Sequence, residues 1–355
     1  MSTTNGQPTP PTPPPPPPAP RADRPWWRIA AGLAVLVVLG VVVFPRAFPR
    51  TDVPESLPGP TTTTTPPTTA APAVPDCGNA VASLRPTGPS TGSVAAGSYM
   101  ADIIGRGRLR VGVSATNLLF SSVDPFTGEF EGFDIDVARE VAIALFGDAS
   151  PQHIEFVVVP QTDRLAVLKD GTVDMVASTF SINCARRQEI AFSSEYFTSG
   201  QRLLVPVEAA AAGVTIDTLS ADAQQSDDRG RVCAAAGSTS IEVLRTLDPA
   251  PHTVAPPTHA ECLALLQQGE IDAVSTDDTL LAGFKVQDPN VEIVGGFLTG
   301  EHYGLGLPPG RDEWVRYVNG VLEDVRSSGR WDAIYAQHLA GPLEPRPAPP
   351  AVYSD

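Results

Sequence analysis

A polar loop behind a short buried segment carries the groups best suited to bind an anion. Residues 173–177 are typical of a buried strand, and residues 178–183 supply hydroxyl side chains and free backbone N–H groups. Arg186 follows this loop. Hydroxyls, N–H groups and a guanidinium just beyond the carboxyl end of a strand form an anion site. The planar fork of Arg186 suits a carboxylate, because it donates two parallel hydrogen bonds.

A short helix before this strand is the element that must position the loop. Apolar residues recur on one side of residues 163–169 and predict a helix there. We expect Asp163 to cap its first turn and Gly171 to end it. The helix and the strand would together hold the polar loop at one edge of a sheet.

Alternating strand and helix patterns around this unit predict an α/β fold. Predicted strands at 109–113, 154–159 and 173–177 alternate with predicted helices at 133–145 and 163–169. This βαβαβ order produces a mostly parallel sheet with helices on both faces.

A second series of strands and helices repeats the design after an apolar extended run at 203–207. Its expected elements lie at 231–235, 240–247, near 253, at 259–268 and at 271–274. We therefore predict two lobes of one α/β design. Because ligands of open α/β sheets bind beyond the carboxyl ends of the strands, we place the ligand in a cleft between the lobes.

Several motifs in a fixed order link these elements to a known family. They are G-F-D-I-D-V-A at 132–138, R-x-x-x-L-x-x-G-x-V-D at 164–174, S-x-x-x-x-R at 181–186, F-S-x-x-Y-F at 192–197, G-S-T at 237–239 and G-E-I-D-A-V-S-T-D at 269–277. In this order they resemble family 3 of the bacterial extracellular solute-binding proteins, the polar amino-acid receptors of ABC importers. The likeness covers about residues 109–339 and implies a two-lobed α/β fold of the type II periplasmic-binding-protein kind.

The resemblance also implies how the chain passes between the lobes. An extended run at 303–307 and helices at 312–326 and 331–339 would return to the first lobe, and crossing strands near Leu203 and Phe297 would form a hinge. The expected boundaries are 77–341 for the solute-binding domain, with lobe 1 at about 100–200 and 299–341, lobe 2 at about 201–298, and a disordered proline-rich tail at 342–355.

Four site residues follow from the family's motifs. Arg186 matches the arginine that binds the ligand α-carboxylate, and Ser181 matches a hydroxyl that shares it. Asp277 matches the acid that accepts the α-ammonium, and Thr239 matches a contact from the second lobe. Alternatives stay open at this point: Arg186 as an exposed salt-bridging residue, Asp277 as a helix N-cap, and Asp278 in the place of Asp277.

Arg164 indicates the class of amino acid. An arginine at the start of this helix resembles the glutamate and aspartate receptors, in which it pairs with the side-chain carboxylate, and the alternative is a surface arginine on a short helix. Ser114 is a further candidate contact, and it stands where many relatives have a charged residue. Asn117 replaces their aromatic lid, so Phe120 or Phe133 would have to pack on the ligand, although both suit a core better.

The residues before the solute-binding domain have a different composition. Residues 1–25 predict a disordered cytoplasmic tail, and residues 49–76 predict an extended Pro/Thr-rich linker. Residues 26–48 between them are apolar and long enough to cross a bilayer. We expect a single-pass anchor with the C-terminal domain outside the cell membrane; the competing interpretation is a cleaved signal peptide and a secreted protein.

Cysteine number and position predict two disulfides. Four cysteines follow the apolar segment, and an even count outside the cell favours disulfides over free thiols. Three pairings are open, and zinc is the alternative use. We prefer Cys233–Cys262, because the predicted helix of Cys262 would pack beside the predicted strand of Cys233, and hence Cys77–Cys184.

Charge and missing motifs exclude several other functions. The net charge of −16 argues against nucleic acid, and any anion site must be locally cationic. The chain has no G-x-S-x-G, no G-x-x-x-x-G-K-[ST] and no H-E-x-x-H motif, and its histidines lack metal-ligand spacing. We therefore expect a monomeric binding protein without cofactor or enzymatic activity. Its membrane partner would be an ABC permease or, alternatively, a signalling protein for which this domain is the amino-acid sensor.

Overall fold

The computed structural model describes residues 76–87 and 94–354. The predicted tail at 1–25 and anchor at 26–48 lie outside the described residues, as does the predicted linker except for its last residue. Among the helices of the described part, none has both the length and the apolar character needed to cross a membrane.

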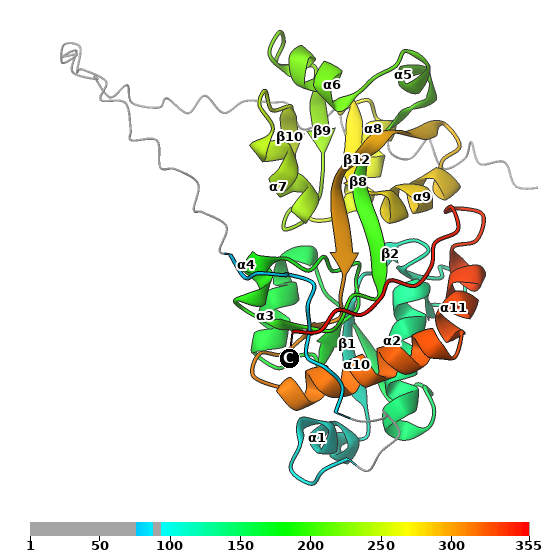
Figure 1. The fold of residues 1–355 in the computed structure, drawn as a ribbon. Helices are drawn as coiled ribbons and strands as arrows, with labels where there is room; N and C mark the ends of the chain where they lie inside the picture. The colour runs from blue at the N-terminus through cyan, green and yellow to red at the C-terminus, as the bar shows by residue number, and fades with distance from the viewer. Residues whose placement is uncertain (1–75, 88–93, 355) are drawn as a thin grey trace, which may run out of the picture. The chain divides into compact units, whose positions relative to one another are not determined.

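The first lobe is built on a five-stranded sheet in the order β5-β1-β6-β13-β7 (Figure 1). Its strands are β1 (Leu109–Val113), β5 (Ile154–Val158), β6 (Met175–Val176), β7 (Ala191–Phe192) and β13 (Gly306–Leu307). Strand β1 pairs in parallel with β5 and β6, whereas β13 pairs antiparallel with β6 and β7. The helices are α1 (Tyr99–Arg106), α2 (Phe133–Phe146), α3 (Arg164–Lys169), α4 (Cys184–Arg187), α10 (Asp312–Ser327) and α11 (Arg330–His338).

The core of the first lobe explains why the chain returns to it. Trp314 of α10 and Trp331 of α11 are buried with Leu109 of β1 and Phe133 of α2 in one apolar cluster. A small antiparallel sheet of β2 (Thr116–Asn117), β3 (Ser121–Val123) and β4 (Phe130–Glu131) lies in the connection between β1 and α2.

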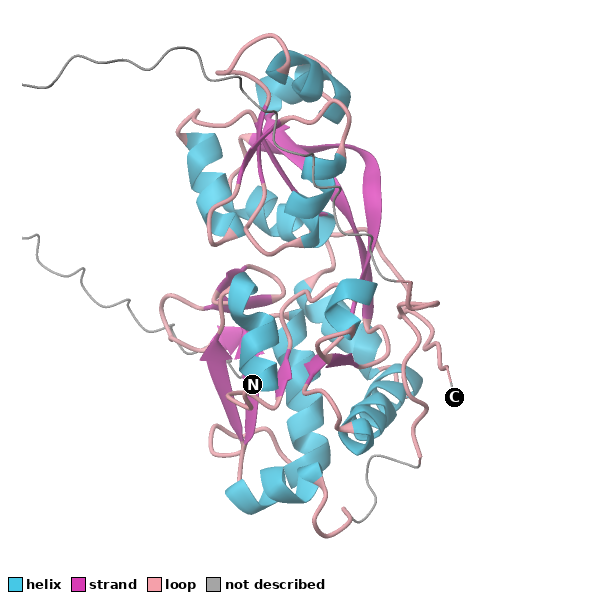
Figure 2. Ribbon diagram, turned by 90° about the vertical axis from the view of Figure 1, so that its left-hand side faces the viewer, coloured by secondary structure: helices cyan, strands magenta, loops and turns pink. Residues whose placement is uncertain are grey.

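The second lobe repeats this design with a five-stranded sheet in the order β10-β9-β11-β8-β12. The strands are β8 (Phe197–Pro206), β9 (Arg231–Cys233), β10 (His252–Val254), β11 (Ala273–Asp277) and β12 (Val291–Tyr303). Around it lie α5 (Val207–Ala211), α6 (Ile216–Ala223), α7 (Thr239–Thr246), α8 (His259–Gln267) and α9 (Asp278–Gln287). Figure 2 shows helices against the sheet in both lobes, which is the predicted α/β arrangement.

Two long strands, β8 and β12, connect the lobes (Figure 1). They pair antiparallel from Val291 opposite Pro206 to Tyr303 opposite Phe197, and the register shifts between Val294 and Thr299. These strands are the two crossings predicted near Leu203 and Phe297. Between these two pairs β12 has more residues than β8, so the ladder of backbone pairs is interrupted there.

Both preferred disulfides are present. Cys233 of β9 bonds to Cys262 of α8, with 5.6 Å between the Cα atoms. Cys77 of the N-terminal segment bonds to Cys184 of α4, with 5.5 Å between the Cα atoms. The cysteines are therefore structural cross-links in each lobe, and the alternative zinc use is wrong.

The start of α3 differs from the predicted cap. A 3₁₀ turn, η2 (Gln161–Asp163), runs directly into the helix, and the side chain of Asp163 makes no capping hydrogen bond. Asp163 has helical backbone angles, whereas a capping residue has extended ones. The predicted stop holds, because α3 ends at Lys169 and Gly171 follows with a positive φ of 74°.

The C-terminal tail is the other correction, because residues 342–354 are packed rather than disordered. Leu343 is buried, Arg346 pairs with Asp278 of α9, and the Tyr353 hydroxyl donates to Glu323 at 2.8 Å. Tyr353 also forms a bridge with Ser83 of the N-terminal segment. Prolines prevent the tail from forming a helix but leave its side chains free to dock in an extended conformation.

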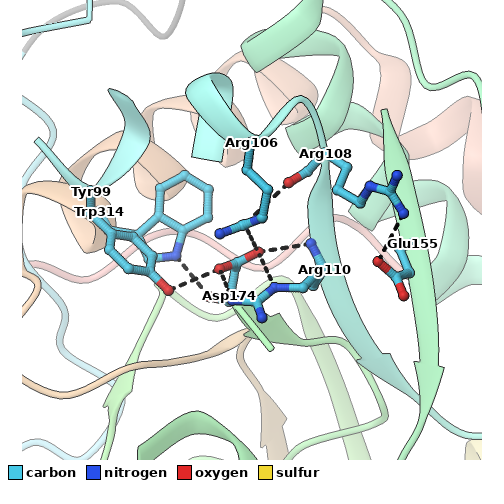
Figure 3. A network of polar contacts seen from close by, with 7 residues as sticks. All are labelled: Tyr99, Arg106, Arg108, Arg110, Glu155, Asp174 and Trp314. Atoms are coloured by element: carbon cyan, nitrogen blue, oxygen red, sulfur yellow. Dashed lines mark hydrogen bonds and ion pairs between the residues drawn. The ribbon is translucent and has the colours of Figure 1, made fainter. Parts of the chain in front are cut away.

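A buried carboxylate, Asp174, links several elements of the first lobe (Figure 3). It accepts hydrogen bonds from the Tyr99 hydroxyl at 2.9 Å and from the backbone N–H of Arg110 at 2.8 Å, and it forms ion pairs with Arg106 and Arg110. Its backbone carbonyl accepts from the indole N–H of Trp314 at 3.0 Å. The last residue of the G-x-V-D motif is therefore structural, joining α1, β1 and α10.

We expect Asp174→Asn to destabilise the fold by about 1–3 kcal/mol, because donors aimed at a charged acceptor lose their partner in a buried site. The matched control is Glu155→Gln, which removes the other carboxylate in Figure 3. Arg108 and Glu155 are about half exposed and 3.4 Å apart, so this change should cost below about 1 kcal/mol. Chemical denaturation measures the free energy of unfolding of both variants. Equal losses would contradict the special role of Asp174.

Candidate functional site

A narrow cavity lies where the loops of the two lobes meet. It is lined by Gln161, Arg164, Thr179, Ser181 and Arg186 of the first lobe, and by Ser238, Thr239, Ser240, His259, Thr276, Asp277 and Leu280 of the second. Five of the six predicted ligand contacts are thus brought together. The cavity volume is about 10 Å³, the room that one water molecule needs, so an amino acid can enter only if the lobes separate.

Two arginines of the first lobe point into this cavity. Arg186 donates to the carbonyl of Ser181 at 2.7 Å and to that of Gly237 at 3.2 Å. Arg164 donates to the carbonyls of Gln161 and Ser178, each at 3.1 Å, and to that of Gly237 at 3.5 Å. Within residues 76–87 and 94–354, neither guanidinium forms a salt bridge, and Arg164 is only 3% exposed. The alternative of a surface arginine at position 164 is therefore wrong.

The aromatic ring of Phe180 packs against both guanidinium groups. Its ring lies 4.2 Å from the guanidinium carbon of Arg164 and 4.9 Å from that of Arg186. Cation–π contacts of this kind stabilise a cation without neutralising its charge. Phe180 was not among the residues predicted, because a buried aromatic after a strand has no sequence signal other than that of core.

The two arginines place two positive charges close together, which favours binding of an anion. Burial, followed by the charge of nearby Arg186, lowers the pKa of Arg164, and burial lowers the pKa of Arg186 to about 10. Both stay charged at neutral pH. A buried cation without a counter-charge is costly, so an anion bound between the two groups would be strongly stabilised.

Asp277 presents a carboxylate to the same cavity. One of its oxygens accepts from the Tyr303 hydroxyl, whereas Oδ1 is buried with no hydrogen-bond partner in the described chain. Burial, and then the neighbouring Glu301, raise the pKa of Asp277. Asp277 makes no capping bond to α9. Asp278 instead pairs with Ser199 and Arg346, so Asp277 is the residue that faces the cavity.

Glu301, a residue that was not predicted, lies close to this group. It comes from β12, is 5% exposed, and accepts from the hydroxyls of Thr239 and Thr299, each at 3.0 Å. It thereby ties Thr239, the predicted contact of the second lobe, to a hinge strand. A lone glutamate before a histidine gives no sequence sign of this position.

Asp134, the aspartate of the G-F-D motif, positions Thr179, which lines the cavity. Its buried carboxylate accepts from the backbone N–H of Thr179 at 2.7 Å and from the Tyr196 hydroxyl at 2.6 Å, and burial raises its pKa to about 7. Thr179 has a φ of +41°, which is unusual outside glycine. The motif therefore fixes a strained residue of the anion loop.

Ser114 does not line the cavity. Its hydroxyl accepts from the backbone N–H of Thr116 at 3.2 Å, and its carbonyl accepts from Ser121, so it organises the turn after β1. Asn117 reaches closer, with its amide nitrogen 3.5 Å from the Thr179 hydroxyl. Phe120 and Phe133 are fully buried in the core of the first lobe, as their sequence context suggested.

Gly237 is a point of close contact between the second lobe and the first. Its carbonyl receives both arginines, its φ is +73°, and an added Cβ would lie 3.2 Å from the Cα of Thr162. We expect Gly237→Ala to weaken every ligand by about 1–3 kcal/mol, because the methyl group opposes lobe closure.

A matched control separates closure from backbone strain in this prediction. Gly213 has a φ of +78° with nothing within 4 Å of an added Cβ, so Gly213→Ala should cost stability but leave ligand affinity unchanged. Calorimetric titration and thermal unfolding of both variants test this. Normal affinity in Gly237→Ala would mean that ligand binding does not need this contact.

The fold and the cavity together define a two-lobed binding protein of the type II periplasmic kind. Residues 109–341 match the family described as bacterial extracellular solute-binding proteins, family 3. The chain belongs to this family.

Relatives and solved structures agree with that assignment. The chain is 31% identical to the ABC transporter glutamine-binding protein GlnH of Bacillus subtilis, over 64% of this chain and 80% of that protein. It is 30% identical to the glutamate-binding protein GluB of Corynebacterium glutamicum, over 59% and 70%. A crystal structure of the ancestral amino acid-binding protein AncCDT-1, a precursor of cyclohexadienyl dehydratase, matches with a TM-score of 0.60 at 28% identity, covering 68% of this chain and 99% of that one. The relatives named here are binding proteins.

Proposed function

We propose that this protein captures an acidic L-amino acid, glutamate or aspartate, between its lobes. The observation that carries the proposal is a pair of guanidinium groups, one buried and one partly buried, without a carboxylate partner in the described chain, opposite a buried carboxylate with an unpaired oxygen. An acidic amino acid offers two carboxylates and one ammonium, which is the complementary set of charges.

Each group of the ligand has an assigned partner in this proposal. Arg186, with Ser181 and Thr239, binds the α-carboxylate. The unpaired oxygen of Asp277 accepts the α-ammonium, and Arg164 binds the side-chain carboxylate. Relatives named as binding glutamate or glutamine, such as those of Corynebacterium and Bacillus, support an amino acid of this size.

A partner and a location complete the proposal. We propose that the domain acts as a monomer outside the cell membrane, held there by the apolar segment at residues 26–48, and delivers its ligand to the permease of an ABC importer. The name of the Bacillus relative, which calls it an ABC transporter protein, supports this partner.

Calorimetric titration of the full-length protein with each of the twenty amino acids tests the ligand. Glutamate or aspartate should bind most tightly. Binding only to a sugar, a metal ion or a basic amino acid would overturn the proposal.

A further inference from the structure

We propose that the C-terminal tail, residues 342–354, is a strap that favours the closed lobes, and that Arg346 is the residue through which it binds the second lobe. The inference rests on capture of a ligand between the lobes, but not on which ligand is captured. The tail lies outside residues 109–341, the part of the chain that matches the family. The family match therefore carries no information about this segment.

The beginning of the tail is fixed on the first lobe. Leu343 is buried in the apolar cluster that also contains Trp331 of α11. The hydroxyl of Tyr335, another residue of α11, donates to the backbone carbonyl of Glu344. These contacts attach the start of the tail to the helix that it follows.

The end of the tail is fixed on the same lobe at a different place. The Tyr353 hydroxyl donates to Glu323 of α10 at 2.8 Å. The backbone N–H of Ser83 donates to the carbonyl of Val352 at 2.9 Å, and that of Ser354 donates to the carbonyl of Ser83 at 3.1 Å. A disulfide joins this N-terminal segment to α4 of the first lobe. The tail is thus anchored to one lobe at both ends.

Between its two anchors the tail reaches the second lobe. Figure 1 shows the tail, in red, rising from α11 toward α9 and returning across β8 to the first lobe. Arg346 forms an ion pair with Asp278, the first residue of α9. The same guanidinium donates to the carbonyl of Thr198 in β8 at 3.0 Å. One side chain therefore joins a helix of the second lobe to a strand that connects the lobes.

The ion pair is largely enclosed and bidentate. The side chain of Asp278 is 6% exposed and that of Arg346 is 22% exposed. The two terminal nitrogens of Arg346 donate to the two carboxylate oxygens of Asp278, one of them at 3.3 Å. The Ser199 hydroxyl also donates to Asp278, at 2.7 Å. A guanidinium that contacts both oxygens fixes the orientation of the carboxylate as well as its distance.

The ion pair can act on closure because Asp278 directly follows Asp277. Asp277 lines the cavity from the second lobe, and α9 begins at the next residue. When the lobes separate, α9 moves with the second lobe, whereas both ends of the tail stay with the first. Opening must then break the ion pair or strain the tail. Arg346 does not line the cavity, so it is a positioning residue that acts through Asp278.

The test is calorimetric titration and dissociation kinetics of the full-length protein with glutamate and with aspartate. Arg346→Met keeps the apolar stem of the side chain and removes its charge. It should weaken both ligands by the same factor, about tenfold, mainly through faster dissociation. Arg330→Met is the matched control, because Arg330 of α11 pairs with Glu140 of α2 within the first lobe. The control should change neither affinity nor dissociation rate.

A double-mutant cycle tests the partner of Arg346. Asp278→Asn removes the charge that Arg346 binds. In that background Arg346→Met should weaken the ligand by less than about threefold, since the ion pair is already broken. If thermal unfolding shows that Arg346→Met is misfolded, Arg346→Lys decides instead. It keeps the charge without the planar fork and should weaken both ligands by a smaller factor.

Each outcome supports or overturns the strap. Unchanged affinity and kinetics in a folded Arg346→Met would make the tail only structural and would overturn the proposal. Tighter binding would assign the ion pair to the open lobes and would also overturn it, as would an equal loss with and without Asp278→Asn. Wild type that binds neither acid would overturn the proposed function alone. Small-angle scattering without ligand then decides: Arg346→Met should have the larger radius of gyration, and equal radii would overturn the strap.

Discussion

Arg186→Ala should weaken every amino-acid ligand by about 3–5 kcal/mol, because each of them carries the α-carboxylate that this residue binds. The loss corresponds to roughly a hundredfold to several thousandfold in dissociation constant. Closure of the lobes removes the carboxylate from water, and an unpaired charge in that position is costly. Calorimetric titration with glutamate and with glutamine should therefore give similar losses.

Arg187, the residue after Arg186, provides the control variant. Arg187 lies beside Arg186 on α4, but its guanidinium donates to the carbonyl of Ala80, outside the cavity. Arg187→Ala should leave ligand affinity unchanged. Arg186→Lys, which keeps the charge but not the planar fork, should fall between wild type and Arg186→Ala. Normal binding by Arg186→Ala would show that the anion loop is assigned wrongly.

Arg164→Ala should act on acidic ligands selectively. Without the guanidinium, the side-chain carboxylate of glutamate or aspartate is buried without a counter-charge, and we expect a loss of about 3–5 kcal/mol. Glutamine and asparagine carry no side-chain charge, so they should lose far less. The preference of the protein should shift toward the amides, and competition titrations with paired acids and amides measure this shift.

The structural contacts of Arg164 require a second variant. Its guanidinium also donates to Gln161 and Ser178 and covers Phe180, so alanine removes packing as well as charge. Arg164→Gln keeps a donor in place and should show the same selectivity with less effect on thermal stability. Equal weakening of acids and amides in both variants would make Arg164 structural, and the acidic ligand would lose its main support.

The sequence predicted well those features that depend on neighbours along the chain. Strand β1 has the predicted bounds and α2 differs by one residue, because apolar periodicity is a local property. The polar loop before Arg186 was recognised for the same reason, since its hydroxyls and its arginine lie within nine residues of the sequence. Strand β6 is shorter than predicted, because apolar residues beside a strand can be buried without pairing.

Predictions that required a partner elsewhere in the chain were less complete. Composition predicted a disordered C-terminal tail, and it gave no sign that Arg346 would pair with Asp278 or that Tyr353 would meet Glu323. Ser114 follows a strand at the expected place, yet the turn after β1 directs its hydroxyl toward Thr116.

The sequence by itself thus indicated the α/β lobes, the preferred cysteine pairing and the two arginines of the cavity. Only the tertiary structure decided what faces those arginines. Gln161 and His259 are 98 residues apart, and Glu301 follows Thr239 by 62 residues. Such groups meet because β8 and β12 fold one lobe onto the other. Periodicity along a chain records which side of an element is buried, but it does not record which distant residue will lie opposite.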